Sequence, residues 1–349
     1  MERNHIIRKN LAVGVILLFI GTCLIPTDAQ YIVKSSSSAS RGDWLCVGGS
    51  GPGNYTKIQD AVDNASDGDT VFVYAVSSPY KENIVIHTSI SLIGEDKNTT
   101  IIDGANNSHH GVNITADNVT VRGFTIQNCS GFGTTELGSA IRISSDYNRI
   151  TDNILVDNEY GITTNVYNLS PPFPPSKGHN TITNNVIINN GAGIFILMGW
   201  NNTVRGNIVS QSEMGIMVGP AMNTNISFNS ISEIGFGVWI IDSYNTVIYQ
   251  NNISYNGIGV LTMITSADKI LQNNFIGNNR SAISNQGLLS KIKSLKIKLD
   301  LPIRRNIWKG NYWDGPRSLP YMIPGVFLKF SFQVDWHPAQ EPYDIPGMR

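Results

Sequence analysis

Two glutamates, Glu213 and Glu233, are the residues whose type and spacing best suit catalysis in this chain of 349 residues. Inverting glycoside hydrolysis needs an acid and a base whose carboxyl groups lie about 6–10 Å apart, with room for a water molecule between them. Tyr255 comes shortly after Glu233 in the chain and could line a sugar subsite beside such a pair. The alternative is that both glutamates are solvated surface groups without a chemical role.

Aromatic side chains form a second candidate site. Phe236 and Trp239 could form a platform on which sugar rings stack. They belong to an apolar stripe of outward positions that is longer than a soluble monomer normally leaves exposed. The stripe is formed by two columns, which are Phe195, Met217, Trp239, Leu261 and Ile283, and Ala192, Met214, Phe236 and Ile258. As an alternative to sugar binding, we expect the apolar C-terminal segment to fold back and cover this stripe.

Metal ligands are sparse. His109 and His110 are weak candidates, since imidazole suits copper, as does the thioether of methionine. No His-x-His or Met-x-x-Met array converges, however, and methionines on an apolar face more often serve packing. We therefore expect no metal site and no cofactor from the residues alone.

These side chains must be positioned by a sequence repeat in which equivalent residues recur every 22 residues. Asparagine keeps this spacing at Asn185, Asn207, Asn229, Asn251 and Asn273. Apolar and polar residues alternate within each repeat, as they do in strands, and no window keeps helical spacing. An unbroken repeat of about 22 residues with this pattern predicts an all-β fold, a parallel β-helix in which each repeat is one coil. We expect the asparagines to form a structural ladder at a corner of the coils, each amide bonding to the backbone and to the next amide.

Three further apolar columns should point inward and form the core. They are Ile182, Val204, Ile226, Ile248 and Ile270; Ile187, Val209, Ile231, Ile253 and Phe275; and Ile194, Ile216, Val238, Val260 and Ala282. Glycine keeps the same step at Gly193, Gly215, Gly237 and Gly259 and predicts a second corner, where φ is positive or the backbone approaches closely. A proline-rich insertion at 170–179 lengthens one coil.

The ends of the chain have other roles. Residues 1–29 resemble a secretory signal peptide, with an uncleaved anchor as the alternative, and residues 30–55 lead into the coils. The β-helix should span 56–285 and open with a capping helix near 57–65, because an open end would expose strand edges and core. Residues 286–349 should cap or cover the other end. Cys46 and Cys129 could form a disulfide or remain two thiols.

The charge balance limits the partners. Charged residues make up 15% of the chain and the formal net charge is −1. This near-neutrality does not favour nucleic acid or an anionic membrane as a partner. We expect membrane contact only through an uncleaved N-terminal segment.

Several segments carry a family resemblance. The segment 55–73, Y-T-K-I-Q-D-A-V-D-N-A-S-D-G-D-T-V-F-V, resembles right-handed β-helix proteins of the pectin-lyase-like class. The Asn/Gly coils and the tail N-I-W-K-G-N-Y-W-D look more specifically like NosD-like repeat proteins, which are abundant in archaea. The resemblance implies a right-handed single-stranded solenoid, and copper only as a family association. It says little about activity, because this fold hosts lyases, hydrolases, esterases and adhesins alike.

The sequence thus predicts a secreted or cell-surface β-helix that binds polysaccharide or another envelope component, without catalysis. One alternative is a carbohydrate-active enzyme, a polysaccharide hydrolase or lyase, that uses Glu213 and Glu233. The other is a copper-handling accessory protein of the NosD-like type.

Overall fold

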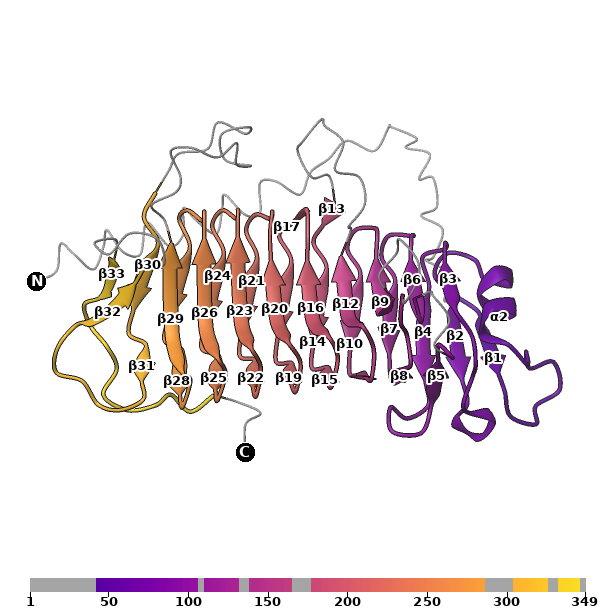
Figure 1. Ribbon diagram of the computed structural model, residues 1–349. Coiled ribbons are helices and arrows are strands. Elements are labelled where there is room, and N and C mark those ends of the chain that lie inside the picture. The colour runs from indigo at the N-terminus through magenta and orange to yellow at the C-terminus, as the bar shows by residue number, and fades with distance from the viewer. Residues whose placement is uncertain are drawn as a thin grey trace, which may run out of the picture. The chain divides into compact units, whose positions relative to one another are not determined.

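The computed structural model describes residues 42–105, 110–131, 138–164, 177–285, 304–325 and 332–345. Three long parallel sheets of 11, 9 and 9 strands form the body of the described chain, and each regular coil contributes one strand to each sheet (Figure 1). The expected parallel β-helix is therefore confirmed. No helix among the described residues is long and apolar enough to span a bilayer. The expected signal peptide or anchor lies outside these residues.

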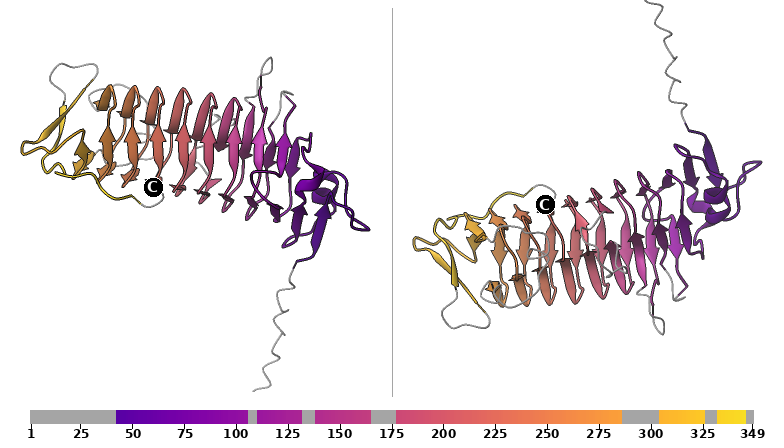
Figure 2. Two further views of the ribbon diagram at one scale, coloured as in Figure 1. Left: turned by 90° about the horizontal axis from the view of Figure 1, so that it is seen from below. Right: turned by 90° about the horizontal axis from the view of Figure 1, so that it is seen from above.

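The strands of the three sheets follow one another in chain order (Figure 2). Sheet A comprises β1 (Trp44–Val47), β2 (Thr70–Val73), β4 (Ser91–Gly94), β7 (Thr120–Arg122), β10 (Arg149–Thr151), β14 (Thr181–Thr183), β18 (Thr203–Arg205), β21 (Asn225–Ser227), β24 (Val247–Tyr249), β27 (Lys269–Leu271) and β30 (Ile307–Lys309). Sheet B comprises β5 (Ile101–Asp103), β8 (Thr125–Gln127), β11 (Ile154–Val156), β15 (Val186–Ile188), β19 (Ile208–Ser210), β22 (Ser230–Ser232), β25 (Asn252–Ser254), β28 (Asn274–Ile276) and β31 (Tyr312–Trp313). Sheet C comprises β3 (Ile84–Ile86), β6 (Val112–Ile114), β9 (Ser139–Ile143), β12 (Tyr160–Thr164), β16 (Ala192–Ile196), β20 (Met214–Val218), β23 (Phe236–Ile241), β26 (Ile258–Met263) and β29 (Arg280–Asn285).

The remaining elements are short. They are α2 (Ile58–Asn64), the 3₁₀ turn η1 (Ala75–Ser77), the paired strands β13 (Lys177–Gly178) and β17 (Gly199–Trp200), and the antiparallel pair β32 (Tyr321–Pro324) and β33 (Phe332–Asp335).

Strand pairing follows the predicted repeat. Val204 pairs with Ile226, which is one repeat further on. Ile150 pairs with Ile182, so the coil that carries the insertion keeps its register in spite of its greater length. The three predicted inward columns are buried throughout, with exposed fractions of 0–2%. β-Branched side chains stacked coil over coil therefore form the core.

The five predicted asparagines form one continuous ladder of hydrogen bonds. In Asn207, for example, the backbone N–H and Nδ2 both donate to Oδ1 of Asn229, at 2.9 and 3.0 Å, and Nδ2 also donates to the carbonyl oxygen of Ile182. The same pattern runs from Asn153 to Asn311. All of these amides are 0% exposed. Each amide thus pairs corner groups that burial would otherwise leave unsatisfied.

The ladder ends on a carboxylate. Asp335 in β33 is 0% exposed, and its Oδ2 accepts from the backbone N–H and Nδ2 of Asn311 at 2.9 and 3.0 Å. The same oxygen accepts from Nε1 of Trp313, and Oδ1 accepts from the backbone N–H groups of Gly310 and His337. A carboxylate only accepts hydrogen bonds, so it closes a row whose last member has only donors left to satisfy.

The glycine column does not lie at a corner, which corrects the prediction. Gly193, Gly215 and Gly237 are the second residues of β16, β20 and β23 and do not have positive φ. Glycine is needed for close approach, because a Cβ on Gly215 would lie 2.3 Å from the carbonyl oxygen of Gly237. Corner positions with positive φ are occupied instead by residues such as Asn184 and Gln211.

Both ends of the core are covered. At the N-terminal end α2 buries Ile58 and Val62, as predicted, and the Glu82 carboxylate accepts from the first backbone N–H groups of this helix. At the other end the Trp313 ring is fully buried between Phe275 and Tyr321, with ring centroids 4.4 and 4.0 Å apart. Aromatic stacking thus replaces the next coil as the cover of the core.

Removing one ladder amide should destabilise the protein. We expect Asn229→Ala to lower the free energy of unfolding by roughly 2–4 kcal/mol, because each buried group left unpaired costs about 1–3 kcal/mol. The control is Asn223→Gly in the same coil, which removes an exposed amide at φ 53°, where glycine is well tolerated. Chemical denaturation measures both. Equal losses in the two variants would contradict the role of the ladder.

Adding an amide should stabilise a second, interrupted ladder. Asn148, Asn180 and Asn202 repeat the same pattern, but the next position is Thr224, and Nδ2 of Asn202 is buried without a partner. Thr224→Asn would supply an acceptor and should raise the free energy of unfolding by about 1 kcal/mol. Thr224→Val, which supplies none, is the control in the same denaturation measurement. The idea is wrong if the asparagine variant is no more stable than the valine variant.

Candidate functional site

The two glutamates lie at adjoining corner positions of successive coils. Glu213 immediately precedes β20, and Glu233 immediately follows β22. Both side chains are exposed, and Nε2 of Gln211 donates to Oε2 of Glu233 at 3.4 Å. Glu213 aligns with Gly235 on the next coil, so no side chain stands beside it there. Both carboxyl groups therefore lie in an open setting and not in a buried pocket.

Tyr255 does not turn toward Glu233. The two residues occupy equivalent positions one coil apart, since Ser232 pairs with Ser254. The Tyr255 ring is 66% exposed and lies over Gly277 of the following coil, where an added Cβ would come within 2.7 Å of its Cδ1. The ring therefore leans away from the coil that carries Glu233.

Phe236 and Trp239 do lie together, on the outer face of sheet C. Their ring centroids are 5.6 Å apart, and both side chains are half-buried. Further along the stripe, Leu261 and Ile283 are buried, at 6% and 4% exposure. The segments predicted to cover the stripe lie largely outside the described residues, except that Phe332 is 56% exposed.

Of the two histidines, His109 lies outside the described residues and His110 is buried. Its Nδ1 accepts from the backbone N–H of Ser139 at 3.2 Å, and its Nε2 lies 3.0 Å from Nη1 of Arg142. No group of three or more His, Cys, Asp or Glu side chains that could hold a metal ion occurs in the described part of the chain. His110 thus has structural contacts on both ring nitrogens.

A second amide row runs along the outside, beside sheet A. Nδ2 of Asn223 donates to Oδ1 of Asn201 at 3.0 Å, and Nδ2 of Asn245 donates to Oδ1 of Asn223 at 2.8 Å. At one end of the row Asn201 contacts His179, whose ring stacks on Tyr147 with centroids 4.7 Å apart. We call Asn201, Asn223 and Asn245 the outer amide row. Sequence reasoning missed this row, although the three asparagines visibly keep the step of the repeat.

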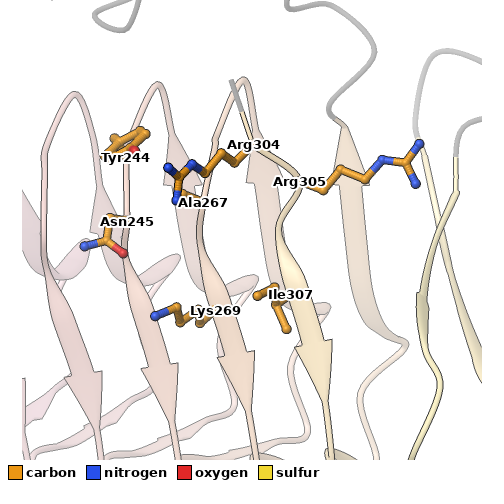
Figure 3. Close-up of a pocket in the computed structure, with 7 residues that line it drawn as sticks. All are labelled: Tyr244, Asn245, Ala267, Lys269, Arg304, Arg305 and Ile307. Atoms are coloured by element: carbon orange, nitrogen blue, oxygen red, sulfur yellow. The ribbon is translucent and has the colours of Figure 1, made fainter. Parts of the chain in front are cut away.

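The other end of the outer amide row opens into a hollow of about 270 Å³ (Figure 3). It is lined by Tyr244, Asn245, Ala267, Lys269, Arg304, Arg305 and Ile307. The row stops there because the next equivalent position is Ala267, which has no amide. In Figure 3 the amide oxygen of Asn245 is on the side of Ala267 and Lys269, whereas Arg305 points away from the other side chains. We call this the Arg304 hollow.

A second hollow, of about 410 Å³, lies on the same sheet, toward the other ends of its strands. It is lined by Tyr249, Leu271, Gln272, Lys309 and Gly310. Nearby, the Arg205 guanidinium lies 4.0 Å over the Phe228 ring, which contacts Tyr249 edge to face. The outer surface of sheet A therefore combines amides, aromatic rings and cations.

Cys46 and Cys129 are free thiols, which excludes the disulfide between them. Cys46 is half-buried, whereas Cys129 is fully buried beside Gly104 and Gly111. Burial raises the pKa of the Cys129 thiol to about 12. Because a thiolate would be desolvated there, Cys129 is unsuited to nucleophilic chemistry.

Comparison with known proteins supports the fold. Residues 174–318 match the family described as periplasmic copper-binding protein (NosD), and residues 65–218 match the right-handed β-helix region. The chain is thus a right-handed β-helix protein with a NosD-like segment. Among curated proteins it is similar to a probable pectinesterase/pectinesterase inhibitor 6 of Arabidopsis thaliana, at 28% identity over 137 residues. That similarity spans 35% of this chain and only 24% of the Arabidopsis protein.

Two solved structures share the fold. The complex of XylC with xylose has a TM-score of 0.57 at 12% identity, over 70% of this chain and 67% of that one. The DFA-IIIase of Arthrobacter chlorophenolicus A6 in complex with DFA-III has a TM-score of 0.53 at 14% identity, over 78% and 76% of the two chains. At these identities the likeness concerns the fold alone.

Ionisation of Cys129 should make stability depend on pH. The folded pKa of this thiol lies above its value of 9.0 in the unfolded chain. Its neutral form therefore contributes stability that is fully present below pH 9 and is lost as the pH rises toward 12. In this window we expect the wild type to lose up to about 1.4 kcal/mol per pH unit more than Cys129→Ala does. Urea denaturation with reductant measures this in both proteins. Parallel pH profiles for the wild type and Cys129→Ala would disprove it.

Proposed function

We propose that this chain is an extracytoplasmic, non-catalytic β-helix protein that binds a polysaccharide along the outer surface of sheet A. The outer amide row is the observation that carries this proposal. Its amides are donors and acceptors suited to sugar hydroxyl groups, and they recur once per coil, about 4.8 Å apart. A polymer lying along the stack could therefore contact successive amides in the same way.

The surroundings of the row support this choice of ligand. The row runs from the Tyr147–His179 stack at one end to the Arg304 hollow at the other. Aromatic faces and convergent polar groups are the usual components of carbohydrate sites. Xylose and DFA-III, named in the complexes of two proteins of the same fold, are consistent with a carbohydrate ligand. The description of the NosD family as periplasmic supports an extracytoplasmic location.

Two other functions remain as second candidates. The position of Glu213 and Glu233 on successive coils favours a carbohydrate-active enzyme in which Phe236, Trp239 and Tyr255 would contact the sugar. The match of residues 174–318 to a copper-binding family favours copper handling. Because the two glutamates are exposed and no metal-binding cluster occurs among the described residues, we place binding without cleavage first.

A retention assay tests the proposal. The purified protein is passed over immobilised polysaccharides, both neutral and acidic, and the eluate is analysed for released reducing ends and unsaturated products. We expect retention on at least one polymer without product. Asn201→Gly combined with Asn223→Gly should reduce retention at least about fivefold, because two of the three amides are lost, whereas Glu213→Gln should leave retention unchanged.

Other results would favour the alternatives. Product release that Glu213→Gln abolishes would establish the enzyme. Stoichiometric copper uptake in equilibrium dialysis, lost when both His109 and His110 are replaced, would establish copper handling. Unreduced retention of the double asparagine variant would show that the outer amide row is not the binding surface.

A further inference from the structure

We infer that the Arg304 hollow is a subsite for an acidic sugar residue, so that the polymer bound along the outer amide row is an anionic polysaccharide. The inference rests on the polysaccharide binding proposed above and adds the chemical class of the ligand. The surface changes its character at this end of the row, where neutral amides give way to cations.

The outer amide row ends with a free acceptor at the hollow. Within the row each Oδ1 accepts from the Nδ2 of the following asparagine, as in the pair Asn223 and Asn245. The position after Asn245 is Ala267, whose methyl group cannot donate. Oδ1 of Asn245 therefore faces the hollow (Figure 3) and can accept a hydrogen bond from a sugar hydroxyl group.

The lining of the hollow is positively charged. Lys269 in β27 and Arg304, which precedes β30, contribute two cations to the hollow, Arg305 is a third basic residue in its lining, and none of the seven lining residues is acidic. The carboxylate nearest in sequence belongs to Asp268. That side chain is 1% exposed and belongs to the second, interrupted ladder, where its Oδ1 accepts from the backbone N–H of Thr246. The hollow thus offers positive charge to a ligand from outside.

Arg304 is anchored at its backbone. Its backbone N–H donates to Oγ of Ser266 at 2.6 Å, and the same hydroxyl donates back to the carbonyl oxygen of Arg304 at 3.0 Å. That carbonyl also accepts from the backbone N–H of Ala267 at 3.2 Å. Ser266 is 0% exposed, so the base of the Arg304 side chain is fixed to the preceding coil. A fixed base reduces the entropy that a guanidinium loses on binding an anion.

The groups around the hollow together match an acidic sugar. A hydroxyl acceptor on Asn245, a guanidinium with paired donors on Arg304 and an ammonium on Lys269 suit a ligand that carries both hydroxyl groups and an oxyanion. The Tyr244 ring borders the same hollow and provides an apolar face for the sugar. The volume of 270 Å³ is near the lower end of ligand sites, about 300 Å³, which suits one unit of a polymer.

The cationic surface continues beyond the hollow. Lys309, at the far end of β30, lines the second hollow together with Tyr249 and Gln272. The same pairing of a cation with a tyrosine and an amide thus occurs twice on adjacent parts of sheet A. Two such hollows fit a chain that carries acidic groups on more than one unit.

Polymers that differ only in charge test this subsite. Binding of the full chain to polygalacturonate and to its fully methyl-esterified form is measured by calorimetry, and dextran sulfate and dextran provide a second pair. We expect each acidic polymer to bind at least about tenfold more tightly than its neutral partner, with the difference shrinking as salt is added. Preference for the carboxylated or the sulfated polymer identifies the oxyanion.

Matched variants locate the effect. Arg304→Gln should weaken binding of the acidic polymer at least about fivefold and leave binding of the neutral polymer unchanged. Arg280→Gln makes the same change in net charge at an exposed residue of β29 in sheet C, outside both hollows, and should change the affinity less than about twofold. Thermal denaturation of both variants checks that the fold is intact.

The outcomes separate the two proposals. If the neutral and acidic polymers bind equally, the acidic subsite is refuted while polysaccharide binding stands. If Arg304→Gln and Arg280→Gln weaken binding to the same extent, net charge alone explains the preference and the subsite is again refuted. If no polymer binds, the proposed function itself fails.

Discussion

The buried row of asparagines is the interaction on which the rest of the structure depends. Every coil along this row places one amide at the same corner, where it satisfies a backbone carbonyl and joins the coil to the next one. Because an unpaired amide in the interior is costly, neighbouring coils can pair only in the register that keeps these groups aligned. That register also fixes every outward column. The outer amide row and the hollows on sheet A are therefore consequences of the buried ladder as much as of their own side chains.

Much of the fold could be predicted because it repeats. A constant step places Val204 over Ile182 and under Ile226, and the alternation of polar and apolar residues assigns the inner face without reference to distant segments. The position of the glycine column could not be predicted in the same way. A glycine required by close approach inside a strand and one required by positive φ at a turn look identical in sequence. Only the backbone distances distinguish them.

The candidate site was harder to predict for a different reason. Lys269 and Arg304 meet because β27 pairs with β30, so that Lys269 is aligned with Ile307. The chain between these two strands is longer than one regular repeat. A search for residues that recur at the regular spacing therefore does not identify Arg304 as a neighbour of Lys269. For the two glutamates the repeat predicted the position in the coil correctly. It could not predict how exposed a side chain is or, for Tyr255, toward which coil the ring leans.

Asp335 gives the ladder a direction. In every asparagine pair of the row, the earlier coil supplies the N–H donors and the later coil supplies the acceptor oxygen. The last asparagine therefore has N–H donors for which no further asparagine provides an acceptor. The Asp335 carboxylate, which lies outside the repeat, accepts hydrogen bonds from these donors. It could end the row after any coil, because every asparagine of the row presents the same two N–H groups to the next position. The number of coils therefore does not depend on Asp335. Duplication or loss of whole repeats can lengthen or shorten the outer surface of sheet A in evolution while both ends stay unchanged.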